Sequence, residues 1–172
     1  MKIEYRHSAS KTNSFIDSPP YWIINNLYDF KSEANARMKM GSVAEQSAEH
    51  ALKNKITDEE AIIDYAKSQY IELKGDESDD ECLWSGIIAN QFVKELPQFG
   101  DVISYQKEIV SPGEKYGLKF DVKGVTDFEF DDVIIDTKAT AYIKRLKSGA
   151  IDSRWYPKDA DLRQQALYKD LF

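Results

Sequence analysis

The chain has 172 residues, of which 42% are hydrophobic and 31% charged, a balance typical of one soluble domain with a core and not of a disordered chain. Its single cysteine, Cys82, excludes an intrachain disulfide framework and a multi-cysteine metal site, and two histidines are too few for a zinc site built on several. The net charge of −7 counts against a protein that coats nucleic acid, and no apolar run reaches membrane-spanning length. The lone cysteine fits a reducing environment best, so we expect a cytoplasmic protein.

The N-terminal half has the apolar spacing that is typical of helices. Pro19 and Pro20 suit a turn or the first positions of a helix, and residues 21–30 read as a short apolar helix. We expect the aromatic side chains of residues 15–30 to belong to the core. Apolar residues recur at helical spacing in three further segments, which are predicted to be helices: 33–53, 58–73 and 82–95.

Two polar segments separate these helices. Thr57 followed by Glu60 forms a capping-box pattern and predicts that the helix over 58–73 begins beside Thr57. The acidic run at 75–81 predicts a solvated loop that also caps the N-terminus of the helix over 82–95, where negative charge is favourable.

Beyond Pro97 the helical spacing gives way to strand patterns. Residues 101–110 are strand-like and are followed by turn chemistry, and Leu118, Phe120 and Val122 then share one face of a second strand. Residues 131–132 form an acidic turn, and residues 133–139 are predicted to be a third strand. Helical spacing returns from residue 157 onward.

This order predicts an α+β fold with a helical N-terminal half, followed by a small mixed or antiparallel sheet with a covering helix. We expect the three strands to form an antiparallel meander. We expect a single domain over 1–172, with a helical part at about 14–96 and a sheet-containing core at about 97–172. Because the last residues still read as helix, we expect a fragment or a chain truncated at its C-terminus.

Charge is distributed unevenly along the chain. Residues 136–172 contain eight basic and five acidic residues, which gives this segment +3 and leaves −10 for residues 1–135. The asymmetry permits a basic face on an acidic body, and a chance fluctuation over so short a segment explains it equally well.

The third predicted strand ends in a pair of charges. Ile134, Asp136 and Lys138 share one face, because residues two apart in a strand point the same way, and the apolar residues on both faces predict a central, buried strand. Asp127 ends the preceding strand, and the tight turn brings it near Asp136. Two converging carboxylates repel each other, and a divalent cation such as Mg²⁺ offsets that repulsion. A lysine beside the metal can orient a water and stabilise developing charge, so the arrangement suits phosphodiester hydrolysis. The simpler alternative is a surface Asp–Lys pair that closes a hairpin.

The wider pattern resembles the core motif of the PD-(D/E)XK nuclease superfamily, and more closely its RecB-like branch. Gly124 to Asp127 matches the G-x-x-D context of the first acid, and Asp136 to Lys138 matches the D-x-K motif. Gln164 to Tyr168 matches the Q-x-x-x-Y signature, whose Gln and Tyr share one helix face. Upstream, Glu45 stands where many members carry His, and Ser18 stands where the iron–sulfur members carry Cys, so no cluster is expected.

The resemblance implies a restriction-endonuclease-like core and a role for each matching residue. Asp127 and Asp136 would bind Mg²⁺ or Mn²⁺, with the Thr137 carbonyl as a further ligand. Glu45 would complete the carboxylate shell or hold a metal-bound water, and Lys138 would position the attacking water and the scissile phosphate.

The resemblance also implies substrate contacts downstream. Gln164 and Tyr168 would contact the DNA backbone or brace the lysine, and Arg154 and Lys158 are candidate phosphate contacts. Bland alternatives remain for several of these: a solvent-facing acid for Glu45, a surface residue for Gln164, a core aromatic for Tyr168 and a packed loop for Arg154.

Together these features predict a metal-dependent DNA exonuclease of phage replication or recombination, acting in the host cytoplasm. Its partners would be DNA and either a second copy of the chain or a phage recombination protein. Two alternatives stay open: a catalytically inactive DNA-binding or assembly module that keeps the nuclease fold, and a viral scaffold protein in which D-x-K only closes a hairpin.

Overall fold

The computed structural model describes residues 7–28 and 33–137, together with positions 164, 166 and 169, which are helical. The chain divides into two compact units. The first unit comprises Met1–Ser32, Gln106–Thr126 and Ser153–Phe172, and the second comprises Glu33–Tyr105 and Asp127–Asp152. Helices and strands both contribute, and helices dominate the N-terminal half, so the predicted α+β class is confirmed.

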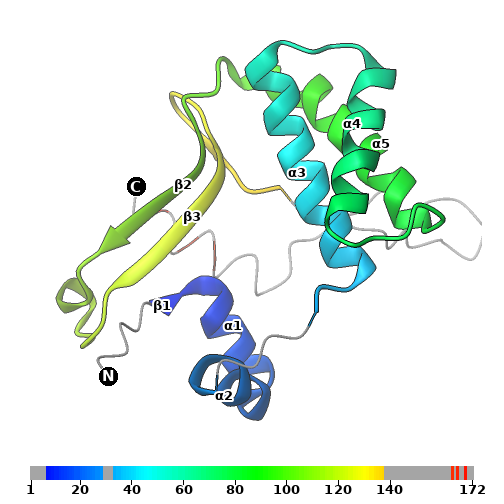
Figure 1. Cartoon of the computed structure of the whole chain (residues 1–172). Coiled ribbons are helices and arrows are strands. Elements are labelled where there is room, and N and C mark those ends of the chain that lie inside the picture. The colour runs from blue at the N-terminus through cyan, green and yellow to red at the C-terminus, as the bar shows by residue number, and fades with distance from the viewer. Residues whose placement is uncertain (1–6, 29–32, 138–163, 165, 167–168, 170–172) are drawn as a thin grey trace, which may run out of the picture. The chain divides into compact units, whose positions relative to one another are not determined.

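The first unit opens with a short strand and two helices (Figure 1). Strand β1 (His7–Ser8) leads into α1 (Ala9–Asp17), and the Ser8 hydroxyl caps this helix by accepting from the Lys11 N–H at 3.4 Å. Helix α2 (Pro19–Leu27) begins at the two prolines, because proline has no N–H to lose in a first turn. The prediction placed only the second helix; α1 was missed.

Aromatic side chains of this region are more exposed than expected. The Phe15 and Trp22 rings meet edge to face at 5.4 Å, and Trp22 is half-buried. Phe15, Tyr21 and Tyr28 are nevertheless 46%, 53% and 77% exposed. Their assignment to the core was therefore wrong.

The second unit contains three packed helices (Figure 1). They are α3 (Ala36–Asn54), α4 (Glu59–Glu72) and α5 (Asp80–Glu95), followed by the 3-10 turn η1 (Leu96–Phe99). The sequence predicted all three helices to within a few residues. The cap of α4 differs, because Asp58, and not Thr57, accepts the Ala61 N–H at 2.9 Å.

The core of the second unit joins these helices to the sheet. Small residues on α3 and α5 let the helices approach, and two phenylalanines of the sheet segment, Phe128 and Phe130, fill the space beside them. This main cluster contains Ala48, Ala51, Ile62, Ala89, Val93, Leu96, Phe128 and Phe130.

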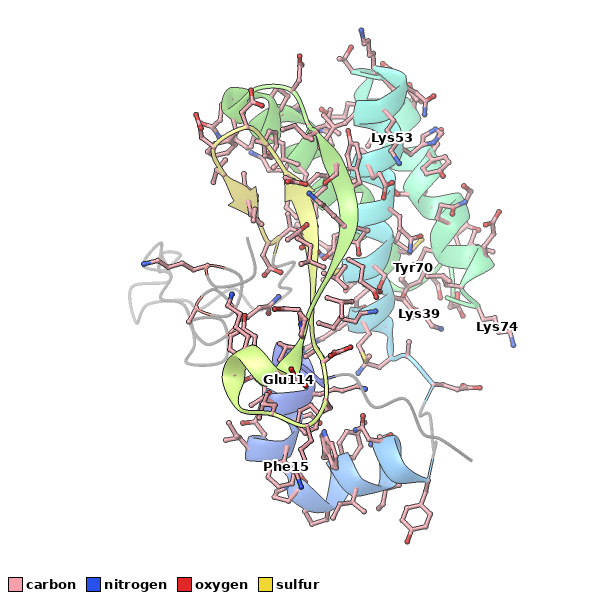
Figure 2. The ribbon with its side chains drawn as sticks, turned by 90° about the vertical axis from the view of Figure 1, so that its left-hand side faces the viewer. Phe15, Lys39, Lys53, Tyr70, Lys74 and Glu114 are labelled. Atoms are coloured by element: carbon pink, nitrogen blue, oxygen red, sulfur yellow. The ribbon has the colours of Figure 1, made fainter. Side chains whose placement is uncertain are left out.

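A second cluster of buried residues in this unit includes Tyr70. Lys39, Tyr70 and Lys74 lie together at one end of α3 and α4, and Lys53 lies at the other end of α3 (Figure 2).

The described sheet is small and mixed. Its order is β1-β3-β2, with β4 also paired to β3. Strand β1 runs parallel to β3 (Val122–Glu129), and β4 (Ile134–Ile135) runs antiparallel to it, so the sheet is not a purely antiparallel meander. Strand β2 (Ser104–Ser111) lies beside β3 (Figure 1).

Irregular backbone shortens the strands relative to the prediction. After the 3-10 turn η2 (Gly113–Tyr116), Leu118 and Phe120 precede β3 and are not part of it. In β2, Gln106 has a φ of 47° and the alternation of burial is lost beside it, as at a β-bulge. The chain passes between the two units at this residue and again between positions 126 and 127.

The third predicted strand is shorter and more exposed than expected. Strand β4 has two residues, both half-buried, and Val133 before it is 37% exposed. Among the described strands, β4 pairs only with β3. The expectation of a buried strand over 133–139 was therefore wrong for Val133, Ile134 and Ile135, because apolar residues on both faces of a strand do not ensure that both faces are covered.

Within residues 7–28 and 33–137 and the three later positions, no helix has the length and apolarity needed to cross a membrane.

Candidate functional site

The β3–β4 hairpin fixes the register of the two segments that carry the candidate metal-binding acids. Phe128 pairs with Ile135 and Glu129 with Ile134, and the Phe130 N–H donates to the Val133 carbonyl at 2.8 Å across the turn. Continuing this register by one pair places Asp127 opposite Asp136. Residues directly opposite in an antiparallel pair point to the same face, so the register brings these two carboxylates to one side of the hairpin.

Asp127 is held by the residue that follows Asp136. The Thr137 N–H donates to Asp127 Oδ2 at 2.7 Å, and the Thr137 hydroxyl donates to the same oxygen at 3.0 Å. These bonds tie the chain after β4 to β3 beyond the last ladder pair. The sequence analysis assigned a role to the carbonyl of Thr137 and missed its hydroxyl. The hydroxyl could have been found from the hairpin register, because Thr137 follows the residue that the register sets opposite Asp127.

The two faces of β3 differ in character here. Phe128 and Phe130 are buried against the helices, whereas Asp127 and Glu129 alternate with them and are half-buried. The Ser104 hydroxyl donates to the Glu129 carboxylate. Asp127 therefore lies on the face of β3 that is turned away from the helical core. It shares that face with Glu129, whose carboxylate is bonded to Ser104.

The helix-facing side of the hairpin is closed by an aromatic contact. The Tyr105 ring meets Phe128 edge to face at 5.6 Å, and Lys53 Nζ lies 4.7 Å from the Tyr105 ring centre. Burial raises the pKa of the Tyr105 phenol, with Lys53 opposing and Glu49 adding to the rise. A neutral ring beneath the lysine ammonium is the arrangement that a cation–π contact requires.

The hairpin is strongly acidic. Between Gly124 and Thr137 it carries no Lys or Arg, so its formal charge is −5. The charge comes from these acids: Asp127, Glu129, Asp131, Asp132 and Asp136. DNA phosphate would be repelled from this segment unless a cation is present.

The third predicted carboxylate comes from a helix. Glu45 is half-buried on α3, on the same side as Ala48 and Leu52, which pack in and against the core cluster containing Phe128. In the part of the chain that the structure describes, no three His, Cys, Asp or Glu side chains gather as they would around a metal ion. The described acids thus offer a pair on the hairpin, and a role for Glu45 beside them stays a prediction.

The remaining predicted site residues fall largely outside the described residues. Gln164 is described and lies in a helix, half-buried. Lys138, Arg154, Lys158 and Tyr168 lie outside the described residues, and so do most of the predicted last strand and helix.

Comparison of the chain with protein-family models, with curated proteins and with solved structures gave no match.

Proposed function

We propose that this protein is a divalent-metal-dependent deoxyribonuclease that hydrolyses phosphodiester bonds, acting as an exonuclease in phage replication or recombination. The observation that carries the proposal is the hairpin register, which pairs Phe128 with Ile135 and, continued by one pair, would set Asp127 opposite Asp136, two residues before Lys138. The fold that the proposal assumes is a restriction-endonuclease-like core, with β3 and the segment after β4 supplying its two acids.

The donor set fits Mg²⁺ or Mn²⁺. Mg²⁺ prefers oxygen ligands and is commonly bound by one or two carboxylates together with waters and substrate phosphate. Asp127, Asp136 and the Thr137 carbonyl supply such oxygens from one short hairpin. When bound, the metal would lower the pKa of a water and polarise the phosphoryl oxygen.

The other roles belong to the chain's own side chains. The carboxylates would hold the cation that offsets the −5 charge of the hairpin and admits DNA phosphate. Lys138, two residues after Asp136, would orient the scissile phosphate and stabilise the charge that develops on it. Glu45, Gln164, Tyr168, Arg154 and Lys158 would support the metal and the DNA backbone as the resemblance implies.

The first test is cleavage of labelled single- and double-stranded DNA with Mg²⁺ or Mn²⁺, compared with EDTA. We expect Asp127→Ala, Asp136→Ala and Lys138→Ala each to lower the cleavage rate by about 100-fold or more, because losing even an indirect support of a metal ligand costs about 10–100-fold. Asp132→Ala makes the same charge change in the turn of the same hairpin and should cleave like the wild type. Equal cleavage by the wild type and Asp136→Ala would sink the proposal.

The second candidate is a non-catalytic DNA-binding or assembly module with the same fold. The absence of a three-acid cluster among the described residues favours it. It predicts DNA binding without cleavage, unchanged by Lys138→Ala. Calorimetry separates the two, because Mn²⁺ binding that disappears in Asp127→Ala supports the nuclease.

A further inference from the structure

We infer that Thr137 is a positioning residue of the metal site, whose hydroxyl holds the Asp127 carboxylate in the orientation that binds the cation. The inference rests on the proposed function, since it assumes that Asp127 is a metal ligand. It concerns the side chain of Thr137, whereas the resemblance assigned only its backbone carbonyl.

The geometry of two donors on one oxygen carries the inference. The backbone N–H and the hydroxyl of Thr137 reach Asp127 Oδ2 at 2.7 Å and 3.0 Å. A carboxylate oxygen offers two lone-pair directions, so these two bonds use both of them on Oδ2. Two donors on one oxygen therefore hold the Asp127 carboxylate from the Thr137 side.

The same two bonds also restrict how the carboxylate can turn. Aspartate has only two side-chain torsions, and a terminal carboxylate torsion is otherwise broad. Thr137 itself is only 7% exposed, so water competes little for its hydroxyl. The hydroxyl is thus a fixed second donor that holds the plane of the Asp127 carboxylate.

The two bonds can be separated by substitution. Every residue other than proline keeps the N–H at position 137, so a side-chain change removes only the hydroxyl bond. Thr137→Val keeps the branched shape without the hydroxyl. Thr137→Ser and Thr137→Ala both lack the methyl group and differ from each other only in the hydroxyl. Threonine with valine and serine with alanine therefore form two matched pairs.

The experiment measures Mn²⁺ affinity of the full chain by calorimetry without DNA, together with thermal unfolding followed by circular dichroism. We expect Thr137→Val and Thr137→Ala to bind Mn²⁺ about 10–100-fold more weakly than the hydroxyl-bearing member of each pair, the range seen when a group supporting a metal ligand is removed. Thr137→Ser should bind like the wild type. If valine at this position prevents folding, the serine–alanine pair still gives the comparison.

The outcomes separate this inference from the proposed function. Equal Mn²⁺ affinity within both pairs, with unfolding temperatures that differ, would show that Thr137 only closes the hairpin and would overturn the inference alone. A wild-type protein that binds no Mn²⁺ would overturn the proposed function, and the inference with it.

Discussion

Tyr70 and Gly75 show how single residues fix the end of a helix in the second unit. Tyr70 is fully buried, and its hydroxyl donates to Asp79 Oδ2 at 2.9 Å, while the Gly75 N–H donates to the Tyr70 carbonyl at 3.0 Å. Burial, strengthened by Asp79, raises the pKa of Tyr70, so the phenol stays protonated and remains a donor. Asp79 stands at the N-cap position of α5, as the acidic run suggested, but its carboxylate serves Tyr70 and makes no capping hydrogen bond.

Gly75→Ala should destabilise the protein because there is no room for a methyl group. A Cβ at position 75 would overlap the Tyr70 ring and would lie 2.7 Å from the Tyr70 carbonyl oxygen. We expect a loss of about 1–3 kcal/mol in the free energy of unfolding, the usual cost of overpacking. Urea denaturation measures it. Asp64→Ala, at an exposed position in the middle of α4, is the control and should stay within about 0.5 kcal/mol of the wild type.

At the scale of elements, the helices were more predictable than the strands. The apolar spacing located α3, α4 and α5, because a helical face packed on a core leaves its period in the sequence. Strands β1 and β4 have two residues each, and so short a segment has no period to read. Their pairing depends on β3, which lies more than a hundred residues from β1 along the chain.

The cap of α4 gives a prediction at this scale. Asp58 accepts the Ala61 N–H, whereas the capping-box pattern favoured Thr57. We expect Asp58→Ala to lower the free energy of unfolding by about 1 kcal/mol, the typical cost of losing a cap. Thr57→Ala should change it by less than about 0.5 kcal/mol. The urea midpoints of the two variants decide between the positions, and a larger loss for Thr57→Ala would restore the sequence-based assignment.

At the scale of the whole molecule, the two units bury apolar side chains to different degrees. The second unit holds fully buried residues on all three of its helices, including Val43, Ala66 and Ala89. In the first unit, several large apolar side chains of α1 and α2 are 40–53% exposed: Phe15, Ile16, Tyr21, Ile23 and Ile24. Burial of apolar surface is the main stabilising term, so local stability should differ between the units.

Hydrogen exchange tests this difference on the intact chain. We expect backbone amides of α3, α4 and α5 to exchange more slowly than those of α1 and α2, by at least about tenfold, because opening the buried helices exposes their core. Deuterium uptake followed by mass spectrometry resolves the two groups of peptides. Equal protection of both groups would mean that α1 and α2 are covered in solution.

The sequence by itself determined the α+β class, the three helices of the second unit and the hairpin that brings Asp127 toward Asp136, because each follows from residue spacing over a short segment. Only the tertiary structure decided that β1 joins β3 in parallel, that β4 is half-buried, and that both donors of Thr137 bind one oxygen of Asp127. Those features depend on register and packing between segments. Residue spacing records which face of a segment is buried, but it does not record which partner meets that face.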